Sequence, residues 1–159
     1  MFRLNYIVIY LSFIVGMTLL ILPLPTWARI YRPDWVALIL IYWSMALPKY
    51  LGLWSSLIIG LLVDSLIGTL LGQHALALVL INYVNLNFYL RIRVLSWFQQ
   101  SLYVFVLLLI SQLIIFWLDG IMGLAMPIQD VFGSPFVGAL MWPFVFFILR
   151  DIRRKAILS

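Results

Sequence analysis

The chain has 159 residues, of which 66% are hydrophobic and only 9% are charged, and its mean hydropathy is +1.16. An ordinary soluble domain has about 25% charged residues, so this composition excludes a water-soluble fold and predicts an integral membrane protein. The net charge of +5 comes from Lys and Arg residues that stand in small groups between apolar runs, a pattern typical of membrane orientation, and it argues against nucleic acid as a partner.

Six apolar runs follow one another along the chain, and each predicts a transmembrane helix, since a crossing takes about 20 apolar residues. The predicted spans cover residues 4–22, 35–47, 51–67, 71–90, 97–118 and 135–149. The gaps between them are too short for an extramembrane domain. Residues 1–159 are therefore predicted to form one all-α membrane domain, a compact bundle of six transmembrane helices.

The first two spans are bounded by prolines. The first has no small-residue cleavage site before Pro23 and Pro25, so it is predicted to be retained rather than removed as a signal peptide. The second lies between Pro33 and Pro48, and at about 1.5 Å per residue it covers only about 20 Å. A helix this short must tilt little, thin the bilayer or be shielded by neighbouring helices.

From the third span into the start of the fourth, small or polar residues recur at every fourth position: Gly52, Ser56, Gly60, Asp64, Gly68 and Gly72. Steps of four keep these residues on one stripe, and in lipid such a stripe marks the close approach of another helix. A groove for a ligand or a lipid is the alternative. Gly68 and Gly72 can equally form the turn before the fourth span, because glycine accepts backbone conformations that other residues avoid.

Asp64 is the only acid within this stripe, and apolar residues flank it on both sides. A carboxylate buried in such surroundings is costly unless it is paired or protonated. Two interpretations remain open. Asp64 is either a site of partner binding or conformational change, or it forms a hydrogen bond that ties two helices together.

The segment Arg32-Pro33-Asp34-Trp35 opens the second span. Proline in a first helical turn needs no donor, and Asp34 complements the positive end of the helix dipole. The segment therefore predicts a helix start, with Arg32 and Asp34 as an exposed pair. A sharper hypothesis is that Arg32, Asp34 and Asp64 meet near the outer face as a polar cluster for a partner.

The remaining internal polar residues are His74, Asn82 and Asn85 in the fourth span, and Gln112 and Asp119 in the fifth. Such side chains are predicted to hydrogen-bond between helices. A single histidine without a second histidine or a cysteine is a poor metal site. The chain has no cysteine and no phosphate-binding or nucleophile motif, so no metal, no cofactor and no catalytic activity is predicted.

Two further features concern the last third of the chain. Pro143 predicts a kink in the sixth span, because proline removes a helical hydrogen bond. The loop at residues 120–128 is apolar, and it is predicted to dip into the membrane interface or to dock another subunit.

The distribution of Lys and Arg predicts that both termini are cytoplasmic. In this orientation Arg29 and Arg32 lie outside, and eight basic residues lie inside: Arg3, Lys49, Arg91, Arg93, Arg150, Arg153, Arg154 and Lys155. The opposite orientation would place the C-terminal basic cluster across the membrane.

Several of these segments carry a family resemblance. They are Arg32-Pro33-Asp34-Trp35 with residues 36–43, Ala46-Leu47-Pro48, Gly60-Leu61-Leu62-Val63-Asp64 with residues 68–72, and Leu140-Met141-Trp142-Pro143. In length, number of spans and order of motifs, the whole chain resembles the MreD family of rod shape-determining proteins from Gram-negative bacteria.

The resemblance implies a non-enzymatic scaffold subunit of the inner-membrane complex that inserts new peptidoglycan along the side wall. It implies direct association with MreC, and through MreC with MreB filaments, the RodA glycosyltransferase and its partner transpeptidase. It also implies a fold similar to the small-molecule-binding subunits of energy-coupling-factor vitamin transporters, which have six helices and an outward-facing pocket. Asp34, Asp64, Gly68 and Gly72 stand on family motif positions, whereas no role for His74 follows from the resemblance.

A function from another class is the alternative: a subunit that captures a small molecule or a lipid for a membrane transporter. Its pocket would lie behind Arg32, Asp34 and Asp64. Co-purification of MreC or RodA would favour the scaffold hypothesis, and a tightly bound small ligand would favour the transporter hypothesis.

Overall fold

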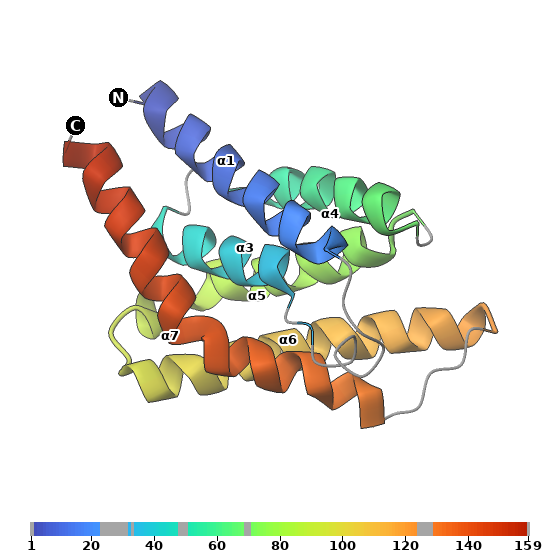
Figure 1. Cartoon of the computed structure of the whole chain (residues 1–159). Helices are drawn as coiled ribbons and strands as arrows, with labels where there is room; N and C mark the ends of the chain where they lie inside the picture. The colour runs from blue at the N-terminus through green and yellow to red at the C-terminus, as the bar shows by residue number, and fades with distance from the viewer. Residues whose placement is uncertain are drawn as a thin grey trace.

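The computed structural model describes residues 2–22, 32, 34–47, 51–68, 71–123 and 129–158. Within this part of the chain there are helices and no strands (Figure 1), so the predicted all-α bundle is confirmed. The helices are α1 (Phe2–Ile21), α3 (Trp35–Ala46), α4 (Leu53–Ile67), α5 (Gln73–Ile92), α6 (Trp97–Ile121) and α7 (Gln129–Leu158).

Among the described residues, three segments are long and apolar enough to cross a membrane by themselves: α5, α6 and the part of α7 from Val131 to Lys155. Residues Tyr6–Ile21 of α1, together with α3 and α4, form shorter apolar helices. The sixth helix is longer than the predicted 135–149. It continues through residues 150–155, which are mostly Arg and Lys, because both residue types favour helix, whereas the prediction covered only the apolar span.

Sequential helices run in opposite directions, so the bundle has two distinct ends (Figure 1). One end holds both chain termini, the end of α3 at Ala46 and the turn from α5 to α6 at residues 93–96. We call it the terminal end. The other holds the end of α1, the start of α3 and the turn from α4 to α5, and we call it the hairpin end.

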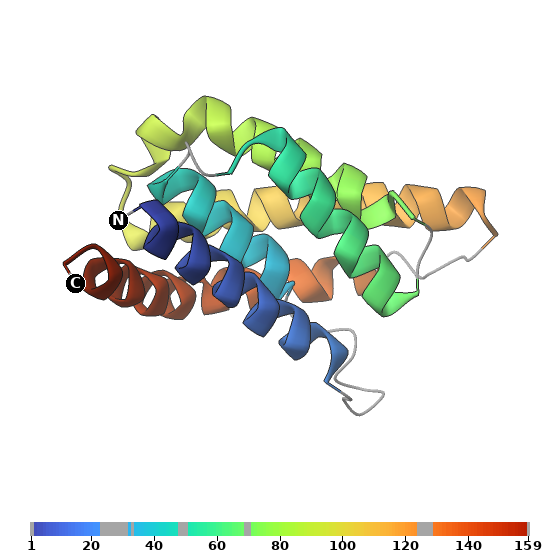
Figure 2. The same cartoon turned by 90° about the horizontal axis from the view of Figure 1, so that it is seen from above.

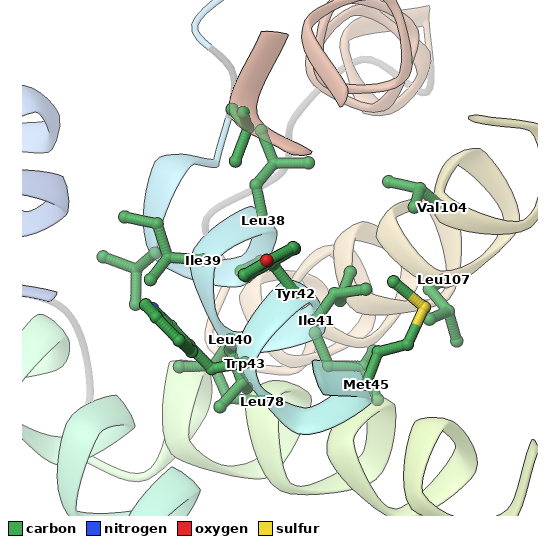
Figure 3. Close-up of a cluster of buried hydrophobic side chains, with 14 of the residues drawn as sticks. Leu38, Ile39, Leu40, Ile41, Tyr42, Trp43, Met45, Leu78, Val104 and Leu107 are labelled. Atoms are coloured by element: carbon green, nitrogen blue, oxygen red, sulfur yellow. The ribbon is translucent and has the colours of Figure 1, made fainter. Parts of the chain in front are cut away.

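The short helix α3 lies in the middle of the bundle. It packs against α1, α5, α7 and α6, which surround it in the view of Figure 2. All residues from 36 to 45 are buried, and their side chains point outward in several directions into the core (Figure 3). A helix that is apolar all round is a core helix. The short second helix is thus confirmed, and its neighbours shield it.

Two asparagines of α5 tie this core together, as predicted. The Asn82 side chain accepts a hydrogen bond from Ser44 of α3, and its amide donates to the carbonyl of Gly52 and the hydroxyl of Ser56, each at 3.3 Å. The Asn85 amide donates to the carbonyl of Ile41 at 3.0 Å. These bonds join α3 and α4 to α5 inside the apolar interior, where a polar group without a partner is costly.

Replacing Asn82 with Ala should lower the free energy of unfolding by about 1–2 kcal/mol, because inter-helix hydrogen bonds in membrane proteins contribute on that order. Asn87→Ala is the matched control, since Asn87 is exposed and donates only to Tyr83 of its own helix. Thermal unfolding in detergent, followed by size-exclusion chromatography, measures both variants. Equal stability losses would contradict the linking role of Asn82.

The helix α7 bends, as the proline predicted. Pro135 and Pro143 both lie inside it, and Figure 1 shows that α7 changes direction part of the way along. Gly138 lies between the two prolines, and a Cβ atom there would come within 2.6 Å of Leu108 Cδ1. The bent helix therefore packs closely on α6.

Candidate functional site

Asp64 lies near the end of α4 at the hairpin end and is fully buried. Its Oδ2 accepts a hydrogen bond from the backbone N–H of Gly72 at 2.9 Å, and its Oδ1 accepts one from the N–H of His74 at 2.9 Å. The N–H of Ala75 approaches Oδ2 at 3.4 Å. The carboxylate of one helix thus binds the first backbone donors of the next.

The turn between α4 and α5 explains this arrangement. Gly68 ends α4 with φ 84°, and Gly72 precedes α5 with φ 102°, both in the left-handed region that favours glycine. A glycine before a helix has no side chain that can cap it, whereas the first N–H groups of a helix need acceptors. Asp64 supplies them from the preceding helix, and its negative charge complements the positive end of the α5 dipole.

His74 completes the contact. Its Nδ1 lies 2.8 Å from Asp64 Oδ1. A proton on Nδ1 lets the His74 ring donate a hydrogen bond to this carboxylate oxygen. The His74 side chain is 16% exposed, so the pair lies at the edge of the buried region. The sequence left the role of His74 open. The signal that could have indicated this contact is that His74 follows Asp64 by ten positions, with the turn glycines Gly68 and Gly72 between them.

The glycine stripe faces α5. A Cβ atom at Gly60 would lie 2.2 Å from the Ala75 Cα atom, so only glycine lets the two backbones approach this closely. Ser56, one turn earlier, reaches Asn82 of α5. A Cβ atom at Gly52 would meet nothing within 4 Å. The stripe therefore forms a helix contact at its centre, and at Gly68 and Gly72 it forms the turn.

Arg32 and Asp34 bind the ends of two other helices. The Arg32 guanidinium donates to the carbonyls of Leu20 and Leu22, at the end of α1. The Asp34 carboxylate accepts the N–H of Ala37 at 3.2 Å and caps the start of α3, as the sequence predicted. Arg32 and Asp34 form no ion pair with each other, so their prediction as an exposed pair was wrong. Each side chain instead binds the end of a helix.

Sequence reasoning missed one link at this end of the bundle. The Gln73 amide donates to Asp119 Oδ1 at 2.8 Å and to the carbonyl of Ile115 at 3.2 Å. Gln73 begins α5, and Asp119 lies in the last turns of α6. The prediction that Asp119 hydrogen-bonds to another helix is confirmed, but the sequence did not identify Gln73 as its partner.

The hairpin end is therefore a set of connections between helix ends. It brings Asp64, Gly68, Gly72 and His74 together, while Arg32 and Asp34 act on α1 and α3. Within the described residues, no group of three or more His, Asp or Glu side chains could hold a metal ion. The apolar loop at 120–128 lies in the described part only up to residue 123, and Pro23, Pro25, Pro33, Pro48 and Arg29 fall outside the described residues.

Comparison with known proteins points to one family. The family model of the rod shape-determining protein MreD matches residues 1–152. The chain is 34% identical over 154 residues to the rod shape-determining protein MreD of Haemophilus influenzae, an alignment that covers 97% of this chain and 95% of that protein. No solved structure matches, so the likeness to the subunits of energy-coupling-factor transporters stays a prediction.

Proposed function

This chain belongs to the MreD family of rod shape-determining proteins, and from that premise we propose that it is a non-catalytic inner-membrane subunit of the elongation complex, with MreC as its direct partner. Membership of the family gives the chain a role in cell shape. Through MreC, the chain joins MreB, RodA and the partner transpeptidase of RodA during peptidoglycan synthesis.

The proposed orientation places the terminal end in the cytoplasm. Arg3 stands at the start of α1, and the other described basic residues at this end are Arg91, Arg93, Arg150, Arg153, Arg154 and Lys155. Arg32 is the described basic residue at the hairpin end. This asymmetry supports the orientation, since Lys and Arg stay on the cytoplasmic side of bacterial membrane proteins.

A non-catalytic role agrees with the use of the polar side chains. Asp64, Asn82, Asn85 and Gln73 all bind backbone groups or side chains of other helices. A general acid, base or nucleophile must instead face a substrate. The polar interior therefore supports a rigid scaffold rather than a reaction centre.

An apolar groove between α1 and α4 is the surface that we assign to MreC. It has a volume of about 240 Å³ and is lined by Tyr10, Phe13, Ile14, Met17, Ile58 and Leu62, among others. Ile14 is 57% exposed and Ile58 is 58% exposed. The groove lies along the side of the bundle, where a partner embedded in the same membrane can pack by shape. It is the observation that carries the proposed contact.

The transporter hypothesis lacks a comparable observation. It required Arg32, Asp34 and Asp64 to face a captured ligand. Arg32 instead donates to α1, Asp34 accepts from the start of α3, and Asp64 accepts from the start of α5. The polar groups that would recognise a ligand serve the fold.

Site-specific photocrosslinking in cells tests the proposed contact. A photoreactive phenylalanine analogue at Ile58, in the groove, should give a covalent adduct with MreC. The same analogue at Trp117 is the control, because Trp117 is 66% exposed on α6 and does not line the groove. An adduct with MreC at Trp117 but not at Ile58, or at neither position, would contradict the assignment.

A further inference from the structure

A cavity of about 410 Å³ opens at the terminal end of the bundle. We call it the arginine cavity. Its walls come from α3, α6, α7 and the end of α5, and they include Tyr42, Met45, Arg93, Gln100, Phe146 and Arg153. The sequence assigned Arg93 and Arg153 to membrane orientation alone. In the fold, they line one space together although 60 positions separate them along the chain.

Arg93 is held in place by backbone contacts. Its Nε donates to the carbonyl of Met45 at 2.8 Å, and its Nη2 donates to the carbonyl of Ala46 at 3.0 Å. The guanidinium also lies over the Tyr89 ring, 5.1 Å from its centroid. A guanidinium has five N–H donors, so these two bonds leave donors for a ligand. Arg93 is thus a positioned cation at the mouth of the cavity.

Arg153 faces the same cavity from α7 without an ion-pair partner among the described residues. Its side chain is half-buried, and a partly buried cation without a counter-ion favours binding of an anion. The surrounding positive charge also favours binding of an anion. Arg150, Arg154 and Lys155 lie nearby in the sequence of α7, and Asp151 is the acid among them.

Tyr42 contributes a buried donor. Its side chain is 1% exposed, yet its hydroxyl has no hydrogen-bond partner within the described part of the chain. The Phe146 ring, which also lines the cavity, packs edge-on against Tyr42 with 5.5 Å between ring centroids. A buried hydroxyl without a partner is unfavourable, and an acceptor oxygen in the cavity would satisfy it.

We propose that the arginine cavity binds the phosphate group of an anionic phospholipid from the cytoplasmic leaflet, an inference that rests on the proposed orientation of the chain. Guanidinium groups match the geometry of phosphate oxygens. Met45 and Phe146 provide apolar walls for the glycerol and acyl parts. Basic pockets between transmembrane helices at the cytoplasmic surface bind such headgroups in other membrane proteins.

The test uses the full chain purified in neutral detergent and titrated with short-chain phosphatidylglycerol, with binding followed by native mass spectrometry. Arg153→Gln should weaken binding about tenfold or more, which is the usual effect of losing one charged hydrogen bond. Arg154→Gln is the matched control. It removes the same charge from the next residue, which is exposed and does not line the cavity, and it should change the affinity less than about twofold. Equal losses in the two variants would overturn the proposal.

Two further arms separate the remaining explanations. Tyr42→Phe should weaken phosphatidylglycerol binding while the melting temperature without lipid stays the same or rises, because a hydroxyl without a partner is removed. Unchanged affinity in this variant would contradict a site that includes the phenol.

Inorganic phosphate at millimolar concentration should not displace the lipid. Displacement would show that the cavity takes a free phosphate instead, and that result would overturn the lipid assignment. Crosslinking to MreC is independent of every one of these results.

Discussion

Replacing Asp64 with Leu is expected to lower the free energy of unfolding by roughly 3–5 kcal/mol, because the change leaves the first donors of α5 unpaired in an apolar interior. The carboxylate accepts the backbone N–H groups of Gly72 and His74 and contacts the His74 ring. The hairpin of α4 and α5 should therefore separate, and cells that carry this variant should lose their rod shape.

Two variants sharpen this result. Asp64→Asn keeps one carbonyl oxygen as an acceptor, so its loss in free energy of unfolding should be about half of the loss in Asp64→Leu. Ser65→Leu is the matched control, since Ser65 is exposed and donates only to Leu61 of its own helix. Thermal unfolding in detergent and cell shape are measured for all three. Normal rod shape at normal protein level in the Asp64→Leu strain would show that neither the cap nor the residue matters.

Replacing Gly60 with Ala should separate α4 from α5, with a loss of about 2–4 kcal/mol. The new Cβ atom would lie 2.2 Å from Ala75 Cα and 2.7 Å from its backbone N atom. Backbone atoms cannot move aside like the end of a flexible side chain, so the whole helix must shift. The shift would also disturb the nearby contact between Asp64 and the start of α5.

Gly52→Ala provides the control on the same stripe. Gly52 has an ordinary φ of −80°, and an added Cβ atom would meet nothing within 4 Å. The melting temperature of the Gly52→Ala variant should match that of the unchanged protein. If the two variants lost the same stability, the close contact at Gly60 would not be what holds the hairpin together.

Much of the fold follows from the sequence. The apolar runs predict the helices because the membrane requires each crossing segment to satisfy its own backbone. The short second span predicted a helix that tilts little, thins the bilayer or is shielded by its neighbours, and the burial of residues 36–45 agrees with shielding. The helix α7 continues past the predicted span of residues 135–149 at both ends, because an apolar run marks where a helix meets lipid and not where its hydrogen bonds stop.

The partners of individual polar groups were harder to predict. Asp64 stood out as an acid in an apolar stripe, and one of its two interpretations was a hydrogen bond between helices. That it accepts backbone N–H groups of α5 depends on the two left-handed glycines of the turn. The sequence could not predict that Arg93 and Arg153 line the same cavity, since this depends on how α7 packs against α3 and α6.

The hydrogen bonds agree with the proposed scaffold role. Its polar side chains hold helix ends together at Asp64, Arg32 and Gln73, so the bundle presents a fixed outer surface. In a membrane, packing by shape depends on such a surface, because lipid gives little hydrophobic drive for association. A rigid bundle with an apolar groove along α1 and α4 suits a scaffold.

Affinity purification of the tagged chain in mild detergent, with MreC and RodA quantified by mass spectrometry, tests the scaffold role most directly. We expect MreC to co-purify in an amount comparable to the chain itself, with RodA recovered through MreC. The Gly60→Ala variant should recover less MreC per folded molecule than the Gly52→Ala control. Purified chain that carries neither MreC nor RodA, or that carries a tightly bound small molecule in their place, would contradict the account.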